Sequence, residues 1–436
     1  MRKLKTFCRT PRQLFLLLCL LNTALFLVLL PVLGQLGFAW AVMENNSDFA
    51  AADYFLCIQY ALGGKNVYQF GPDACYSPLA YLVFWLLGRM TSVTDFFQGV
   101  DVLQLSYQEM IRNTMPLLAS PYQLIGYLGY LLGGVLLYGY AVSQLNLPEK
   151  TRRALTVCVL FSVPLLFGAL ERGNLTLYVA ALVLVAWKWR DAESPVLREL
   201  ALVLIAVAAG LKFYPAFLGL LYLQEKRWKE AGRLIVYGAV CVFVPFAGFG
   251  GVQGLRQLLG NLSQLSFEEY GHRVQFFKGV LVFLHIRGRA ADVLNLAFLL
   301  VLAALLFWTK SRVRRMTYLA AMLAFYPPNG YRYMLLFFLL PLFAWLEEAS
   351  QQGGAVRYAE GVLFAAMFSI PTLWGILTGF RQGLGPYTLS YVELFIYLAA
   401  WLLLALEVLQ EGQMLLRKRK DDAALQKGGN DRAKTA

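Results

Sequence analysis

Residues 14–33 read LFLLLCLLNTALFLVLLPVL, a run of twenty residues without a charged side chain. A helix needs about 20 predominantly apolar residues to cross the hydrocarbon core of a bilayer. The run is as long as a membrane span, so it does not indicate the shorter apolar core of a cleavable signal peptide. We predict that this stretch is the first transmembrane helix.

Comparable apolar runs recur along the chain of 436 residues. Hydrophobic side chains make up 59% of the residues and charged side chains only 15%, against roughly 25% charged in an average soluble domain. So few charges cannot cover a water-exposed surface, which excludes a soluble multidomain protein. We predict an all-α polytopic membrane protein.

Basic residues gather in short clusters between the apolar runs, for example at 226–233 and 417–420. Short loops rich in Lys and Arg lie on the cytoplasmic side of a membrane. Both chain ends are basic, so both are expected in the cytoplasm and the number of crossings must be even. The sequence predicts about twelve spans, at 14–34, 121–142, 154–170, 174–189, 197–211, 213–224, 234–250, 290–309, 316–326, 334–346, 359–379 and 389–410.

These spans form one membrane domain without an internal repeat. The predicted parts are a cytoplasmic N-terminus (1–13), a single transmembrane domain (14–411) and a basic cytoplasmic tail (412–436), disordered from Asp421. Residues 35–120 form the first outer loop, with interfacial helices. Segments 79–90 and 274–286 are interpreted as interfacial or re-entrant rather than as crossings.

The formal net charge of +13 would also suit a nucleic-acid-binding protein, but the basic clusters follow membrane topology, so no nucleic-acid partner is expected. The chain has two histidines and no Cys-x-x-Cys pattern, which argues against the usual zinc sites. No glycine-rich nucleotide-binding loop is present, and we predict neither a metal nor a cofactor. Cys57 and Cys75 share the first outer loop, so a disulfide between them stays open.

The first outer loop contains an acid close to the membrane, Asp48. We predict a helix from Asp48 to about Leu62, with Asn46 or Ser47 as its cap and Gly63 at its end. An acid at such a place suits a general base that deprotonates a hydroxyl. It would equally well complement the helix dipole.

Two further acids lie on the same predicted side. Asp53 follows in the first outer loop, and Glu171 precedes Arg172 in a tight turn between two apolar runs. Glu171 and Arg172 are either a neutralised pair or an acid and a base that face a substrate cavity.

Lys212 lies far from the basic clusters on either side of it in the sequence, and Pro215 breaks the helix beside it. Charged groups at membrane depth are costly and mark functional sites, and an isolated cation favours a phosphate partner. Other cations share the predicted outer face, namely His272, Arg273, Lys278, Arg332 and Arg381. Tyrosines lie among them, namely Tyr54, Tyr60, Tyr68, Tyr76, Tyr331 and Tyr333. As a set, these residues indicate a site for a phosphorylated lipid that carries a sugar.

Several of these segments resemble the C-type membrane glycosyltransferases, and in particular glycosyltransferase family 87, the polyprenol-phosphate-mannose-type mannosyltransferases. The resemblance runs in order from about residue 45 to 345. It rests on Asp48-Phe49, Tyr60 to Gly63, Asn66-Val67-Tyr68, Tyr76 to Leu79, Arg172-Gly173-Asn174, Gly210 to Pro215, 263–279 and 327–333. The chain departs from the family pattern at three places. Tyr54 lies six residues after Asp48 rather than about four, with Asp53 between them. Glu171 and Arg172 stand in place of Gly-Gln, and Tyr331 and Arg332 lie where the family commonly has a histidine.

The resemblance implies an inverting transfer of a hexosyl, mannosyl-like unit from a polyprenyl-phosphate sugar to a lipid or glycan acceptor. The expected setting is glycolipid or cell-envelope synthesis at the outer face of a bacterial cytoplasmic membrane. It implies catalytic acids among Asp48, Asp53 and Glu171, with Asp48 favoured as the base. The donor phosphate would be bound by Lys212, His272, Arg273 and Arg332, and the substrates by Tyr54, Tyr68, Tyr76, Asn174, Tyr214 and Tyr331. The alternative function is a transporter or flippase of lipid-linked sugars, which would normally show an internal repeat.

Overall fold

The computed structural model describes residues 9–42, 50–91, 93, 105, 107–112, 114–264, 275–327, 331–381 and 391–434. Every regular element in these ranges is helical, which confirms the predicted all-α fold class. Short 3₁₀ or π segments, labelled η, interrupt or extend several α-helices.

The first half of the chain contains α2 (Pro11–Leu33), α3 (Gln35–Val42), α4 (Ala52–Leu62), η2 (Val67–Phe70), α5 (Pro78–Met90), α7 (Tyr107–Arg112), α8 (Thr114–Ala119), α9 (Pro121–Ser143), α10 (Glu149–Leu160), η4 (Val163–Leu170) and α11 (Thr176–Trp189). The second half contains α12 (Pro195–Leu211), η5 (Tyr214–Leu218), α13 (Gly219–Gln224), α14 (Trp228–Phe243), η6 (Val244–Gly248), α15 (Gly251–Gln264), α17 (Phe277–Phe283), α18 (Gly288–Trp308), α19 (Arg312–Phe325), η7 (Arg332–Phe338), α20 (Leu339–Glu348), α21 (Ala355–Met367), α22 (Thr372–Thr378) and α23 (Tyr391–Lys434).

In the described part of the chain, five helical stretches are long and apolar enough to cross a membrane. They are α2, α9, α14 with η6, α18 and the Tyr391–Leu416 part of α23. Two bent pairs raise the number to seven, since α10 and η4 meet at 52° and α21 and α22 at 76°. All twelve predicted ranges overlap helices. The chain is thus a multi-pass membrane protein, and the count of twelve crossings stays a prediction.

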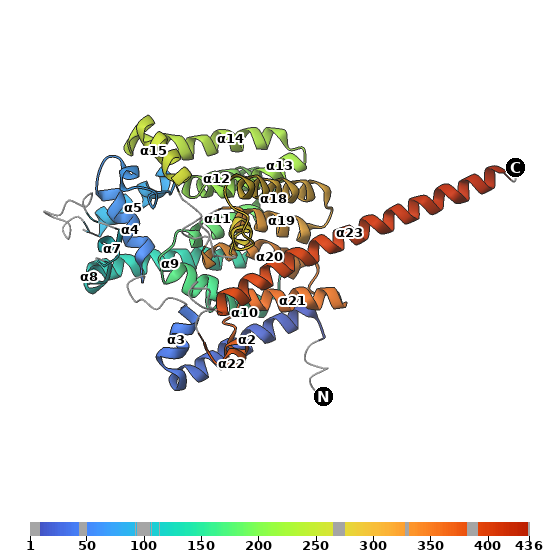
Figure 1. Cartoon of the computed structure of the whole chain (residues 1–436), viewed down its shortest axis with the longest axis horizontal. Coiled ribbons are helices and arrows are strands. Elements are labelled where there is room, and N and C mark those ends of the chain that lie inside the picture. The colour runs from blue at the N-terminus through green and yellow to red at the C-terminus, as the bar shows by residue number, and fades with distance from the viewer. Residues whose placement is uncertain are drawn as a thin grey trace.

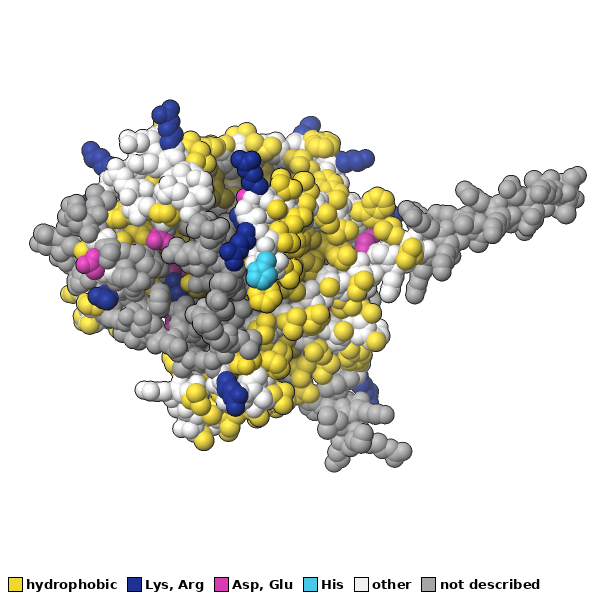
Figure 2. Space-filling model, in the orientation of Figure 1, with side chains coloured by type: hydrophobic (Ala, Val, Ile, Leu, Met, Phe, Trp, Pro, Cys, Tyr) yellow, Lys and Arg dark blue, Asp and Glu magenta, His cyan; other side chains and the backbone are white. Residues whose placement is uncertain are grey.

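The centre of the bundle is formed by α11, α19 and α20. Most of their side chains are buried, as expected for helices that are apolar on every side, and an exception in sequence is the basic first turn of α19 (Arg312, Arg314 and Arg315). The long helices around them expose apolar side chains instead, for example Leu132, Ile235 and Leu300. Figure 2 shows hydrophobic side chains over much of the visible face of the bundle. Such a surface suits contact with lipid rather than water.

The short helices α4, α5, α7 and α8 gather at the end of the bundle that lies opposite the two chain termini (Figure 1). The sides of the membrane on which the first loop and the chain ends lie stay a prediction. Loop 66–77 joins this end to the bundle, because Ser77 Oγ donates a hydrogen bond to the carbonyl of Gly210 at the end of α12.

Helix α12 ends at Leu211, and Lys212 has extended backbone angles (φ −145°, ψ 130°). Pro215 lies in the first turn of η5, and because proline has no N–H it cannot continue α12 with a hydrogen bond to the carbonyl of Leu211, four residues earlier. The break therefore lies where the sequence predicts it. Since Ser77 contacts Gly210, the break also brings the residues before α5 close to Lys212.

Helix α4 begins at Ala52 rather than at Asp48, so the predicted start of this helix was wrong. Ala51 has left-handed backbone angles (φ 55°) and no side chain caps the helix. Instead, the N–H groups of Ala51 and Tyr54 donate to the carbonyls of Glu171 (2.7 Å) and Arg172 (3.2 Å). A turn remote in sequence supplies the cap that Asn46 or Ser47 was expected to provide. The predicted end at Gly63 is confirmed.

The turn before α11 is held tightly against α4. Tyr127 of α9 donates its hydroxyl to the carbonyls of Leu170 (2.6 Å) and Glu171 (2.8 Å). Gly173 has φ +65°, and a Cβ there would lie 2.6 Å from Tyr54 Cβ and 2.8 Å from Tyr127 Cε2. Only glycine fits this position without displacing α4 or α9.

The C-terminal stretch that was predicted to be disordered continues α23 as far as Lys434. The helix projects beyond the bundle in Figure 1. Residues 417–427 are mostly strong helix formers such as Arg, Lys, Ala, Leu and Gln, so their backbone can extend a helix that already exists.

Replacing Gly173 by Ala is expected to lower the thermal unfolding temperature and to abolish activity. Left-handed backbone costs a non-glycine residue about 1–2 kcal/mol, and the added methyl group collides with Tyr54 and Tyr127. The matched control is Gly139→Ala on α9, where a Cβ has open space. Thermal unfolding of both variants in detergent tests this, and equal unfolding temperatures would contradict it.

Candidate functional site

A cavity of about 530 Å³ lies beside α4, at the breaks that precede η5 and η7. Its polar lining includes two acids, a buried lysine, an arginine and several tyrosines. The lining residues are Asp53, Leu56, Cys57, Tyr60, Asp73, Cys75, Tyr76, Ser77, Arg172, Lys212, Phe213, Tyr214, Phe217, Leu262, Tyr326, Pro327, Tyr331 and Tyr333. The volume is within the range of about 300–1,000 Å³ that is typical of small-molecule sites.

Asp53 is the acid in the first turn of α4 and forms a bidentate ion pair with Arg172. Arg172 Nε lies 3.1 Å from Asp53 Oδ2, and Arg172 Nη2 lies 2.8 Å from Oδ1. Asn174 Nδ2 donates a further hydrogen bond to Oδ2 at 2.6 Å. The carboxylate is thus fixed in direction at the edge of the cavity, where its side chain keeps 14% of its surface exposed.

Asn174 connects this ion pair to the lysine. Its amide nitrogen also donates to the hydroxyl of Tyr76 (3.1 Å). Its amide oxygen accepts from Lys212 Nζ at 3.1 Å and from the backbone N–H and the hydroxyl of Thr176. Because the backbone N–H of Thr176 can only donate, the orientation of the Asn174 amide is determined by its surroundings.

Lys212 is only 6% exposed and lies among aromatic rings. Its Nζ is 4.8 Å from the ring centroids of Tyr76 and Tyr333, and 5.9 Å from that of Tyr214. Aromatic faces stabilise a cation without neutralising it. The lysine therefore keeps an electrostatic attraction for an anion in the cavity.

Two tyrosines on either side of Arg332 form an aromatic part of the cavity wall. Tyr331 and Tyr333 stack with centroids 5.8 Å apart, and the guanidinium of Arg172 lies 4.8 Å from the Tyr331 ring. The break before η7 positions both tyrosines, since η7 begins at Arg332 between them.

The positive charges beside Asp53 determine its protonation state. Burial alone would raise the pKa of Asp53, but the Arg172 charge, together with hydrogen bonds from Arg172 and Asn174, lowers the pKa below its ordinary value. Asp53 is therefore a carboxylate at neutral pH. Burial lowers the pKa of Lys212 to about 8, although the Asp53 charge opposes this shift.

The structure brings several of the predicted site residues together. Asp53, Tyr76, Lys212, Tyr214 and Tyr331 line the cavity. Asn174 does not line it but forms hydrogen bonds with Asp53, Tyr76 and Lys212.

Four other predicted residues are not part of the lining. Tyr54 packs in an aromatic cluster behind α4, and Tyr68 bonds to the Tyr76 carbonyl. Glu171 contributes its backbone carbonyl to the α4 cap. Arg332 is buried, with Nε donating to the Phe167 carbonyl at 2.9 Å and Nη1 at 4.0 Å from Glu393. Asp48, His272 and Arg273 lie outside the described residues.

The sequence reasoning missed other lining residues, notably Asp73, Cys75 and Tyr326. Asp73 follows Gly71-Pro72, a pattern typical of a turn, and nothing in its spacing indicates a cavity. Cys57 and Cys75 are free thiols, so the disulfide left open by the sequence does not form. Among the described residues, no cluster of three or more His, Cys, Asp or Glu side chains could hold a metal ion.

Comparison with known proteins gives a single result. A search of curated proteins and a search of solved structures each found no match. The profile of glycosyltransferase family 87 matches residues 75–337, which is more than half of the chain and includes Tyr76, Arg172, Asn174, Lys212 and Tyr331. The predicted resemblance is confirmed, and the chain belongs to glycosyltransferase family 87, a family of membrane glycosyltransferases.

Proposed function

We propose that this protein transfers a hexosyl unit from a polyprenyl-phosphate sugar to a hydroxyl of a lipid or glycan acceptor, at the outer face of the membrane. The observation that carries the proposal is the pairing of one oriented carboxylate and one buried lysine in the same cavity. Asn174 bonds to both Asp53 and Lys212, so the two groups are held in one network. Their charges suit the two ends of a glycosyl transfer.

Lys212 is assigned to the donor phosphate. A buried ammonium among aromatic rings attracts a phosphate more strongly than an exposed one does, because water screens it less. In a lipid-phosphate sugar the phosphate is also the leaving group, and it departs as a stable anion. Positive charge at this point stabilises the departing phosphate, and no general acid is required.

Asp53 is assigned as the general base that removes the proton of the acceptor hydroxyl. It lines the cavity, is ionised at neutral pH and is oriented by three hydrogen bonds. Asp48, the acid favoured on sequence grounds, is the competing candidate. With base and phosphate on opposite sides of the reacting carbon, the acceptor would displace the phosphate directly and invert the anomeric configuration.

The assay uses purified protein in detergent with radiolabelled polyprenyl-phosphate mannose, then with other hexoses, and membrane lipid extract as acceptor. Labelled glycan product with release of unlabelled polyprenyl phosphate supports the proposal. Proteoliposomes test the alternative in parallel. Scrambling of the intact donor between leaflets, without transfer to any acceptor, would identify a flippase and overturn the proposal.

Replacing Asp53 by Asn is expected to reduce kcat by roughly 10²–10⁴-fold, the usual contribution of a general base. The Asn side chain still accepts a hydrogen bond from Arg172 but cannot take up a proton. Asp53→Glu keeps the carboxylate and is expected to retain more activity than Asp53→Asn. Asp48→Asn is the comparison variant, with kcat and thermal unfolding measured for all three. Full activity of Asp53→Asn, with loss in Asp48→Asn, would transfer the role to Asp48.

The pKa of Lys212 predicts a pH dependence on the alkaline side. Only the protonated lysine attracts phosphate, so kcat/KM is expected to fall as the pH rises through about 8, where Lys212 loses its proton. The parameter kcat/KM reports ionisations of the free enzyme. Burial raises the pKa of the neighbouring Cys75 thiol to about 11, so this thiol does not titrate in that window.

The matched variant is Lys212→Arg, because arginine stays protonated throughout this range. Its kcat/KM is expected to be lower at pH 7 but to show no decline between pH 7.5 and 9.5. Profiles of the two proteins with the same donor test the assignment. A parallel decline in both would show that another group controls the alkaline limb.

A further inference from the structure

A group of buried charges lies apart from the polar cavity, where α23 packs against α19 and α21. It lies at the end of the bundle where α2 begins, because a Cβ on Gly361 of α21 would be 3.1 Å from the Pro11 carbonyl oxygen. Figure 1 shows this end opposite to α4. We call the group the α21–α23 charge cluster. Its members are three acids and two arginines, namely Glu360, Glu407, Glu411, Arg314 and Arg357.

The three acids of the cluster are almost completely removed from solvent. Glu360 and Glu407 are 0% exposed, and Glu411 is 4% exposed. A buried carboxylate has lost the water that would stabilise its charge, so it needs an opposite charge and hydrogen-bond donors from the protein. Each acid in the cluster must therefore find both among its neighbours.

The two arginines meet only part of this need. Arg314 Nη1 donates a hydrogen bond to Glu411, and Arg357 Nη1 donates to Glu360 Oε1 at 2.7 Å. Arg314 Nε lies 3.5 Å from Glu407 Oε2 and forms no hydrogen bond with it. Each arginine is thus engaged with a different acid, and the third acid, Glu407, adds a negative charge that neither arginine neutralises.

Three buried oxygens of the cluster have no donor among the described residues. They are Glu360 Oε2 and both carboxylate oxygens of Glu407. The two carboxyl groups lie within hydrogen-bonding reach of each other, yet two ionised carboxylates can only accept and cannot bond to one another. A proton on either group would make it a donor to the other. The same proton would remove the surplus negative charge.

Other polar side chains near the pair are used elsewhere. Tyr318 of α19 donates its hydroxyl to the backbone carbonyl of Glu407 at 3.3 Å, not to its carboxylate. The Gln410 amide lies 3.5 Å from Glu360 Oε1, the oxygen that already accepts from Arg357. Helix α22 carries no titratable side chain. The other charged side chains of α2, α19 and η7 have partners outside the cluster, namely Arg12 with Gln351, Arg312 with Glu348, Arg315 with Glu225 and Arg332 with Glu393.

We propose that Glu360 and Glu407 bind one proton between them at neutral pH, and that this shared proton joins α21 to α23. With it, the cluster carries two negative charges on three acids and two positive charges on two arginines, so it is neutral. A metal cation would also balance the charge, but no three acids in the described ranges are placed to hold one together. The inference does not depend on the transferase activity.

The shared proton links the stability of the fold to pH. A glutamate in the unfolded chain loses its proton near pH 4.3, to within about a unit, whereas the folded protein keeps one at neutral pH. Unfolding then releases a proton, so this contribution to stability is complete at acid pH and is lost as the pH rises. One released proton lowers the ratio of folded to unfolded protein about tenfold per pH unit.

Replacing Glu407 by Gln tests the proposal, because an amide has nearly the shape of a protonated carboxyl group and carries a donor at every pH. We expect this variant to be as stable as the wild type near pH 6. Between about pH 6 and 9 its unfolding temperature in detergent should decline less than that of the wild type. The control is Glu149→Gln, which removes an acid whose side chain is 54% exposed and should leave the wild-type decline unchanged.

Infrared difference spectra detect the proton directly, since a protonated carboxyl group has a C=O stretching band that a carboxylate lacks. At pH 7 the wild type and Glu149→Gln should show this band, and Glu407→Gln should lack it. Glu360→Gln should lack it too, which keeps the test valid in case Glu407→Gln does not fold. A band that persists in both glutamine variants, an equal alkaline decline in wild type and Glu407→Gln, or a stability that follows the sodium concentration instead of pH would overturn the inference.

Discussion

The buried ion pair between Asp53 and Arg172 organises the whole site. Removing one partner of such a pair typically costs about 3–5 kcal/mol, because the other charge is left buried without compensation. Here the pair joins α4 in the first loop to the turn before α11, and the carbonyls of the same turn cap α4. The first loop therefore cannot move away from the bundle without breaking the ion pair and the cap together. Asn174 extends this constraint to Lys212.

The same ion pair sets a chemical limit on Asp53. Arg172 lowers the pKa of Asp53, which keeps the carboxylate ionised but makes it a weaker base. For the proposed role of Asp53 as the general base, a weak base suffices when bond cleavage to the leaving group runs ahead of nucleophilic attack, as in the oxocarbenium-like transition states of glycosyl transfer. In such a transition state the acceptor hydroxyl becomes acidic only as it bonds to the anomeric carbon. Orientation of the carboxylate then matters more than its basicity, and the bidentate contact with Arg172 supplies that orientation.

Composition and periodicity predicted the membrane class, the helical ranges and the helix break beside Lys212, because apolar length, an isolated charge and a proline are local signals. They did not predict the partner of Arg172. The neighbouring Glu171 was the obvious partner in sequence, whereas Asp53 lies 119 residues away from Arg172. The start of α4 was wrong for the same reason, since its cap comes from Glu171 and Arg172 carbonyls and not from a residue beside it. Arg332 is the opposite case. The sequence predicted that it binds the donor phosphate, whereas the structure buries it against the Phe167 carbonyl and Glu393.

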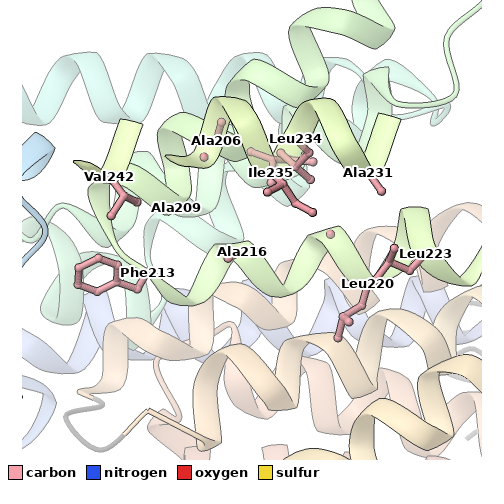
Figure 3. Close-up of a pocket in the computed structure, with 13 residues that line it drawn as sticks. Ala206, Ala209, Phe213, Ala216, Leu220, Leu223, Ala231, Leu234, Ile235 and Val242 are labelled. Carbon is pink, nitrogen blue, oxygen red and sulfur yellow. The ribbon is translucent and has the colours of Figure 1, made fainter. Parts of the chain in front are cut away.

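One helix break accounts for both the polar cavity and a second, apolar cavity of about 450 Å³ between α12, the η5–α13 segment and α14 (Figure 3). An unbroken α12 would continue as a straight span packed against α14, and neither space would exist. The extended backbone of Lys212 and the 3₁₀ segment at Pro215 redirect the chain. Lys212 then contacts Asn174, while Phe213 lines both cavities. The same break therefore places a cation beside one cavity and apolar side chains beside the other.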